Sequence, residues 1–319
     1  MLDQTSNDDE IKNIYHILAM VNDNQGNYTQ AITFYEKSIE IQQNNPSHNY
    51  IDLATSYNNI SIEYDEMEEY SEALFYYEKA LEIYQKNLAS NHSNLSRFYN
   101  NIGLLYHKMG LYSKALSSYE KATEIYQETL PSNHPNLATS YINTGMTLNI
   151  LGEYSKALSF YEKALEIDEK TLPSNHPDLA SCYINLGVLY KNLCDYSKAI
   201  LYYEKALEIQ EKSLSSDHPA LTTSYNNLGL VYETMGDDSK AFLFLEKALK
   251  IHEKLLSSNH PLLAVSYAGI AKVYYNMDDY SKALPCFERA VHIGQHSLPS
   301  DHPNLQQYNI GLKMLKDKM

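Results

Sequence analysis

The sequence has little of what membrane-spanning, secreted and nucleic-acid-binding proteins need. Its 319 residues contain no run of about 18 apolar residues, so we expect no membrane-spanning helix and no membrane as a partner. The N-terminus, MLDQTSNDDE, has neither the basic nor the apolar segment of a secretory signal. Only 25 basic residues stand against 40 acidic ones, and the net charge of −15 argues against nucleic acid and anionic lipid as partners.

Cysteine is scarce and tryptophan is absent. Cys182, Cys194 and Cys286 form no CxxC pair and no even framework. We interpret them as free thiols in a reducing compartment and expect a cytoplasmic protein.

Motifs that carry catalysis are also missing. The sequence has no Gly-rich phosphate loop, no HExxH and no GxSxG, and its acidic residues recur only in step with the period described next. We therefore predict that the chain is not an enzyme and that it uses no cofactor and no metal.

A unit of 42 residues returns seven times along the chain. An alanine row runs through all seven units, and a tyrosine row is complete in them as well. The alanines are Ala31, Ala73, Ala115, Ala157, Ala199, Ala241 and Ala283, and the tyrosines are Tyr15, Tyr57, Tyr99, Tyr141, Tyr183, Tyr225 and Tyr267. A fixed period in this range predicts a stacked array in which each unit contacts mainly its neighbours.

The period divides the chain into a disordered N-terminus, seven repeats and a capping helix. These are residues 1–7, then 8–50, 51–92, 93–134, 135–176, 177–218, 219–260 and 261–302, then 303–319.

Each unit reads as two helices joined by a turn. In the fifth unit, apolar and small residues fall at helical spacing from Leu179 to Tyr190 and again from Ala199 to Ile209. The turn lies at Cys194, where other units have Gly26, Gly110, Gly152 and Gly236, so we expect a left-handed conformation there. A glycine row with Gly187 as its example is expected to face the alanine row across the helix pair.

These residues resemble the tetratricopeptide repeat (TPR). The order Tyr183, Leu186, Gly187, Tyr190, Ala199, Tyr203, Ala206 follows the pattern of that family, with tyrosine in place of its tryptophan. The 42-residue period, the NHP linker and the NN[IL]G stretch are similar to the kinesin light chain class of these repeats. The resemblance implies an all-α, right-handed α-solenoid, a superhelix of seven helix-turn-helix repeats plus a C-terminal capping helix.

Six histidines recur at the start of successive units and could suggest a metal site: His92, His134, His176, His218, His260 and His302. Equivalent positions in neighbouring repeats lie at least about 8–10 Å apart, whereas zinc needs all its donors at roughly 2.0–2.3 Å. We interpret the histidines as linker residues that shape the helix start together with the preceding Asn or Asp and the following Pro.

One polar row is not explained by packing. It consists of Asn59, Asn101, Asn143, Asn185 and Asn227, which lie off the apolar face of the first helix. In TPR arrays the first helices line a concave groove, and asparagines at this position can hold a peptide main chain. Asparagine also occurs there in the general family pattern with no ligand implied.

Helical spacing places Arg97, His107, Lys108 and Lys191 on the same face as the asparagine row. We therefore predict a mildly basic peptide-binding groove for an extended segment with acidic and apolar residues.

Three functional hypotheses remain open. The favoured one is a non-catalytic scaffold or adaptor that binds an extended segment of a partner protein in the concave groove. The alternative is the targeting or regulatory region of a larger enzyme, such as an ADP-ribosyltransferase, whose catalytic domain is not in this chain. The third is self-association through the ends of the array.

Overall fold

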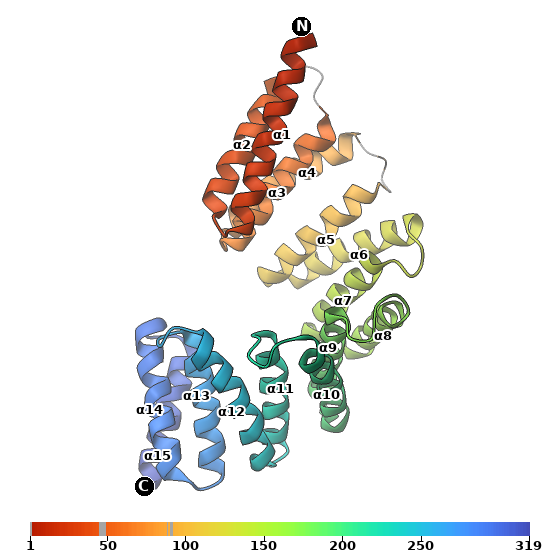
Figure 1. Cartoon of the computed structure of the whole chain (residues 1–319). Helices are drawn as coiled ribbons and strands as arrows, with labels where there is room; N and C mark the ends of the chain where they lie inside the picture. The colour runs from red at the N-terminus through yellow and green to blue at the C-terminus, as the bar shows by residue number, and fades with distance from the viewer. Residues whose placement is uncertain (1, 45–48, 88, 90–91) are drawn as a thin grey trace. The chain divides into compact units, whose positions relative to one another are not determined.

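The structure is a computed structural model that describes residues 2–44, 49–87, 89 and 92–319, and in these residues it contains fifteen α-helices and no strand (Figure 1). Odd-numbered helices are the first and even-numbered helices the second of each pair. In chain order the helices are α1 (Leu2–Asn24), α2 (Tyr28–Asn44), α3 (Tyr50–Glu66), α4 (Tyr70–Asn87), α5 (Ser93–Lys108), α6 (Tyr112–Thr129), α7 (Pro135–Ile150), α8 (Tyr154–Thr171), α9 (Pro177–Asn192), α10 (Tyr196–Ser213), α11 (Ala220–Thr234), α12 (Asp238–Leu255), α13 (Pro261–Asn276), α14 (Tyr280–Ser297) and α15 (Pro303–Lys318).

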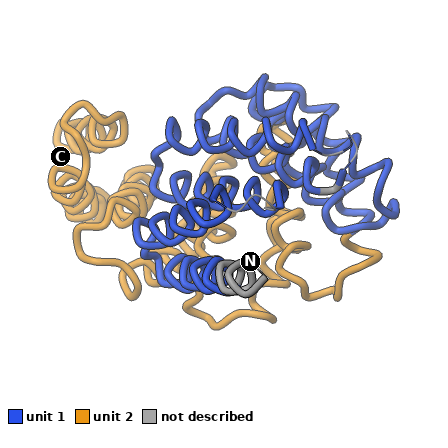
Figure 2. The backbone as a smooth tube through the Cα atoms, turned by 90° about the horizontal axis from the view of Figure 1, so that it is seen from above, with its two compact units in different colours: residues 1–167 blue, residues 168–319 orange. Residues whose placement is uncertain are grey.

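The chain forms two compact units, residues 1–167 and 168–319, with the division inside α8 (Figure 2). Within each unit the two helices of a pair pack on each other, as α3 does on α4 and α13 on α14. Second helices other than α8, where the chain divides, also pack on the first helix of the following pair, as α12 does on α13. In the part of the chain that the structure describes, no helix is both long and apolar enough to cross a membrane.

The N-terminal prediction needs correction. Residues 1–7 were expected to be disordered, but the backbone of α1 is helical from Leu2 onward. Extending a helix that has already formed fixes the backbone of only one residue for each hydrogen bond gained. Residues 2–9 contain no proline or glycine that would stop this extension.

The six linker histidines cap the helices that follow them. In each case Nδ1 accepts a hydrogen bond from the backbone N–H two residues later, at 3.1–3.2 Å, as between His176 and Asp178. The predicted linker role is therefore refined: the imidazole itself, and not the preceding Asn or Asp, satisfies a free donor of the first turn.

The turn between the helices of a pair has the expected left-handed residue. Gly26, Gly110, Gly152 and Gly236 have φ between 73° and 78°. Glu68, Cys194 and Asp278 take the same position in other repeats with φ of 58–62°, where a Cβ is strained. The prediction for Cys194 is confirmed.

The core of the third, fourth and fifth helix pairs combines a large ring with a missing side chain. The alanine row is fully buried, as are Tyr119, Tyr161 and Tyr203. A Cβ on Gly187 would lie 2.5 Å from Cε1 of Tyr203, and equivalent glycines face Tyr119 and Tyr161. Three glycines of the row therefore face tyrosine rings rather than the alanine row, because an aromatic ring needs the space that a side chain would fill, and Gly229 faces Leu245.

Successive repeats are joined by a recurring hydrogen bond. The hydroxyl of Tyr183 bonds Glu169, fourteen residues earlier on the preceding second helix, at 3.0 Å. The same bond, at 2.6–2.9 Å, joins Tyr57 to Gln43, Tyr141 to Gln127, Tyr225 to Glu211 and Tyr267 to Glu253. The rings of this row thus pack at the junctions while their hydroxyls hold neighbouring repeats in register.

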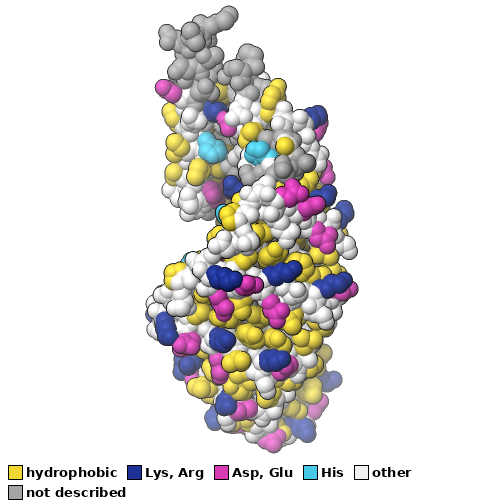
Figure 3. Space-filling model, turned by 90° about the vertical axis from the view of Figure 1, so that its right-hand side faces the viewer, with side chains coloured by type: hydrophobic (Ala, Val, Ile, Leu, Met, Phe, Trp, Pro, Cys, Tyr) yellow, Lys and Arg dark blue, Asp and Glu magenta, His cyan; other side chains and the backbone are white. Residues whose placement is uncertain are grey.

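Charged side chains on the outer faces of the second helices are mixed in sign. Figure 3 shows one face on which lysines and carboxylates lie next to each other rather than in patches of one sign. Lys86 with Glu82 and Lys212 with Glu208 form such pairs at 2.6 Å, and all four side chains are exposed. Exposed pairs of this kind contribute only a few tenths of a kcal/mol, about 0.3–0.5 each, and keep the surface solvated.

Candidate functional site

The five predicted asparagines all lie on first helices and all are half-buried. Asn59, Asn101 and Asn143 belong to the first unit, on α3, α5 and α7; Asn185 and Asn227 belong to the second, on α9 and α11. Because each side chain is partly accessible, its amide can reach a ligand while its stem packs on the helix.

Some of these amides also bond within the protein. Nδ2 of Asn143 donates to Oδ1 of Asn100 at 3.2 Å. Burial, with the nearby carboxylates of Glu63 and Asp23, raises the pKa of Tyr35 to about 12, and a hydrogen bond from Asn59 to its hydroxyl opposes this rise. Each amide has two donors and two acceptor sites, so one internal bond leaves capacity for a ligand.

Asn59 and Asn101 of the first unit line two small polar clefts that share Arg97. The cleft between α5 and α7 measures about 150 Å³ and is lined by Arg97, Asn100, Asn101, Tyr126, Asn136 and Thr139. The cleft between α3 and α5 measures about 60 Å³ and includes Asn58, Asn59, Arg97 and Asn101. Arg97 is exposed, so its guanidinium and the amides offer donors to the same space.

The predicted basic residues contribute unequally. The ammonium of Lys108 lies 2.9 Å from Asp65 and 4.0 Å from Glu66. Burial lowers the pKa of Lys108, but the hydrogen bond and charge of Asp65 outweigh it and the pKa lies above its usual value. The charge of Lys108 is thus matched by carboxylates of the preceding repeat, and the first-unit part of the predicted basic face rests on Arg97.

The other two basic candidates also lie on first helices. Nδ1 of His107 lies 3.0 Å from Oγ1 of Thr147, and burial lowers the pKa of His107, which favours the neutral ring at pH 7. Lys191 lies near the end of α9 in the second unit and is half-buried.

A buried carboxyl on the same helix as Asn59 escaped the sequence analysis. Glu63 occupies a position that is Leu105, Leu189, Val231 or Val273 in other repeats, and it is 2% exposed. Burial, with smaller contributions from Asp23 and Glu66, raises the pKa of Glu63 to about 7. Its pKa therefore lies near neutral pH. The sequence signal was a carboxyl at a position that is apolar in other repeats.

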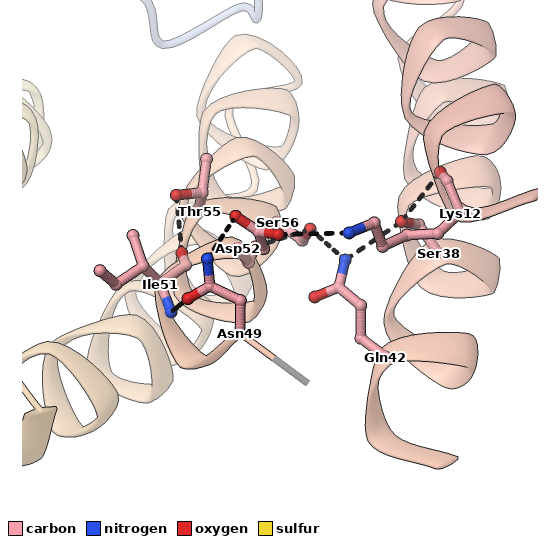
Figure 4. A network of polar contacts seen from close by, with 8 residues as sticks. All are labelled: Lys12, Ser38, Gln42, Asn49, Ile51, Asp52, Thr55 and Ser56. Carbon is pink, nitrogen blue, oxygen red and sulfur yellow. Dashed lines mark hydrogen bonds and ion pairs between the residues drawn. The ribbon is translucent and has the colours of Figure 1, made fainter. Parts of the chain in front are cut away.

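A polar network in the first unit joins α1, α2 and α3 around a cleft of about 170 Å³ (Figure 4). The Lys12 ammonium lies 3.2 Å from Asp52, and the Gln42 amide donates to Ser38 and Ser56 at 3.2 and 3.3 Å. Because equivalent pairs recur at later junctions, as between Gln210 and Ser224, we interpret this network as junction packing.

The second unit contains an apolar pocket that the sequence analysis did not predict. It measures about 470 Å³ and is lined by residues of the first helices α11, α13 and α15 and by Phe287 of α14. Its apolar lining includes Leu230, Val265, Ala268, Phe287, Ile310 and Met314, and Lys272, Asn276, Asn304 and Gln307 add polar groups.

The pocket lies where the asparagine row changes residue type. Continuing the 42-residue step from Asn227 gives Gly269 and Gly311, and both glycines line the pocket. The row thus passes within one unit from Asn185 and Asn227 to two positions without side chains. The replacement of asparagine by glycine was the sequence signal for this opening.

Comparison with models of known protein families assigns this chain to a family. The family model described as tetratricopeptide repeat matches residues 10–86, 94–170, 160–212, 179–254 and 244–295. The chain belongs to the tetratricopeptide-repeat family. This fold typically serves protein–protein interaction, and its members are generally scaffolds without catalytic activity. No curated protein sequence matches the chain.

Solved structures agree with this TPR assignment. BtubC (BKLC) from P. vanneervenii is 25% identical with a TM-score of 0.62, over 72% of this chain and 92% of that one. A Podosopora anserina protein named for kinesin light chain, with nearly identical TPR-like repeats, is 26% identical with a TM-score of 0.56, over 64% and 97%. The apo form of RapI is 18% identical with a TM-score of 0.67, over 89% and 97%, a likeness of fold alone.

Proposed function

We propose that this TPR protein is a non-catalytic adaptor that binds an extended segment of a partner protein along its first helices. The observation that carries the proposal lies in the second unit, where half-buried asparagines are followed at the same repeat position by two glycines that line an apolar pocket. Polar groups for a main chain and a cavity for a side chain therefore occur along one row.

The asparagines would bind the main chain of the ligand. A peptide backbone presents one N–H and one C=O per residue, and a side-chain amide can accept from the first and donate to the second. First helices of successive repeats lie about 8–10 Å apart, which an extended chain spans in about three residues. One asparagine per repeat therefore meets the backbone at regular intervals with little regard to sequence.

The pocket would supply selectivity. At about 470 Å³ its volume is within the usual range for ligand pockets, and its lining is mainly apolar with a few polar groups. It fits a large aliphatic or aromatic side chain. Lys191, in the same unit as the pocket, favours acidic residues elsewhere in the ligand.

Peptide display followed by titration of the selected peptide tests the proposal. In the variant Gly269→Met the new side chain enters the pocket, while the glycine position itself tolerates a Cβ, since the nearest atom, of Leu245, lies 3.6 Å away. We expect at least about tenfold weaker binding because an apolar anchor of the ligand loses its cavity.

The matched control is Leu243→Met, at an exposed position of α12 that does not line the pocket. It should bind as the parent does. Equal affinity of Gly269→Met and the parent for every selected peptide would show that the pocket is not part of the site.

A further inference from the structure

Three carboxyl groups of α1 and α3 gather in the first unit. Glu63 is buried, Asp23 is half-buried near the end of α1, and Glu66 is exposed at the end of α3. Burial and, to a smaller extent, the charges of Asp23 and Glu66 raise the pKa of Glu63, so both neighbours lie within electrostatic range of it. We call these three residues the acidic cluster.

The next pair of first helices shows the same positions with a cation in place. One step of 42 residues leads from Asp23 to Asp65 and from Glu66 to Lys108. The Lys108 ammonium lies 2.9 Å from Asp65 and forms an ion pair with it. In the acidic cluster the lysine position is occupied by Glu66, so a carboxylate stands where the next helix pair has an ammonium.

The buried member of the cluster lacks a partner. Within the part of the chain that the structure describes, Oε2 of Glu63 is buried and has no hydrogen-bond partner. Other repeats have apolar residues at this position, such as Leu105, Leu189 and Val231. A buried carboxyl without a partner destabilises the fold, because its polar atoms have lost water and gained nothing in exchange. A cation from outside the chain would supply the missing interaction.

The cluster lies beside the asparagine row and can be reached from solvent. Asn59, Glu63 and Glu66 follow one another at steps of four and three residues, which places them on one face of α3. The side chain of Glu66 is 50% exposed, and Asp23 is partly accessible. A ligand whose main chain is bound by Asn59 would therefore have the acidic cluster within reach of its side chains.

Among protein side chains, arginine matches this arrangement best. Its guanidinium has five N–H donors in a planar fork and stays charged at all relevant pH values. It can therefore donate to more than one carboxylate, and hydrogen bonds between two charged groups are stronger than neutral ones.

We propose that the acidic cluster of Asp23, Glu63 and Glu66 is a subsite for an arginine side chain of the partner segment. This inference rests on the proposed function, because the asparagine row would hold the main chain next to the subsite. The guanidinium takes the role that Lys108 has for Asp65 at the next helix pair.

Selection of peptides from a random display library on three full-length proteins tests the subsite. The first is the parent, and the second is Glu66→Lys, which supplies the lysine found at the equivalent position of α5. The third is the matched control Glu120→Lys, which makes the same charge reversal at an exposed position of α6. We expect arginine to be enriched at one peptide position with the parent and with Glu120→Lys but not with Glu66→Lys.

Titration of one selected peptide and its citrulline version measures the contribution of the charge. Citrulline keeps the shape of arginine but is neutral, so the parent should bind the citrulline peptide at least about tenfold more weakly. Glu66→Lys should bind the two peptides equally, with the helicity of the parent because residue 66 is exposed.

Arginine enrichment that is as strong with Glu66→Lys as with the parent would overturn the subsite, as would equal affinity of the parent for both peptides. Selected peptides without any arginine preference would overturn it too, while leaving the proposed function in place. A library that yields no binding peptide at all would contradict the proposed function and the subsite with it.

Discussion

The close contact between Gly187 and Tyr203 makes Gly187→Ala an informative change. Gly187 lies in the middle of α9, and a Cβ there would be 2.5 Å from Cε1 and 2.6 Å from Cδ1 of the ring. Tyr203 is fully buried, so its ring cannot turn into solvent. Gly269→Ala is the matched control in the same unit, because it is also mid-helix and its Cβ would have its nearest neighbour at 3.6 Å.

Two opposing terms set the magnitude. Alanine in place of a mid-helix glycine stabilises by about 1 kcal/mol. At Gly187 the new Cβ lies more than about 1 Å inside normal contact distance, and overpacking costs about 1–3 kcal/mol. Gly269→Ala should therefore stabilise by about 1 kcal/mol, while Gly187→Ala should range from neutral to about 2 kcal/mol destabilised. The difference between the two variants isolates the overpacking term.

The assay is urea unfolding followed by far-UV circular dichroism, with the parent and both variants measured side by side. We expect the midpoint of Gly187→Ala to lie clearly below that of Gly269→Ala. If the two variants are stabilised equally, the ring does not occupy the space that the glycine leaves, and the account of the helix-pair core is wrong.

Two further changes test the turns and the buried carboxyl. Cys194→Gly should raise the melting temperature, with a gain in stability of about 1 kcal/mol, because glycine adopts the φ of 59° without strain. Gly152→Ala should lower the melting temperature, because alanine is strained at a positive φ. If Cys194→Gly lowers the melting temperature as well, the left-handed conformation assigned to this turn position is wrong. For Glu63 the unfolded pKa is 4.5 and the folded pKa about 7, so between these values the unfolded chain loses its proton first and stability falls as pH rises. Glu63→Gln should flatten this dependence by roughly 1–3 kcal/mol in urea unfolding between pH 4.5 and 8, and an unchanged slope would contradict the burial of Glu63.

Periodicity predicted most of the fold because each row of residues has one steric role. The alanine and tyrosine rows locate the helix pairs, and the glycines at Gly110 and Gly152 locate the turns. The periodicity could not predict which atoms are in contact. That the imidazole of His176 caps α9, and that Gly187 faces Tyr203 rather than Ala199, depends on rotamers and packing distances.

The candidate site was predicted only in part, because periodicity gives the positions of residues but not their contacts. The positions of Asn143 and Asn185 on first helices follow from the period. The pairing of Lys108 with Asp65 depends on how neighbouring repeats pack, and it changes the charge of the face. The apolar pocket at Gly269 exists because side chains are missing, and a pattern search directed at functional groups does not find a space.

The most direct test of the proposed function replaces Asn185 and Asn227, which lie in the same compact unit as the pocket, together by alanine and measures affinity for a peptide selected by display. Each amide–backbone hydrogen bond contributes about 0.5–1.5 kcal/mol net, so the two losses should weaken binding about 5- to 150-fold with helicity unchanged. The control replaces Asn175 and Asn259, two exposed asparagines of the linkers in the same unit, and should bind as the parent does. Equal affinity of the parent and the row variant would show that the asparagine row does not hold the ligand.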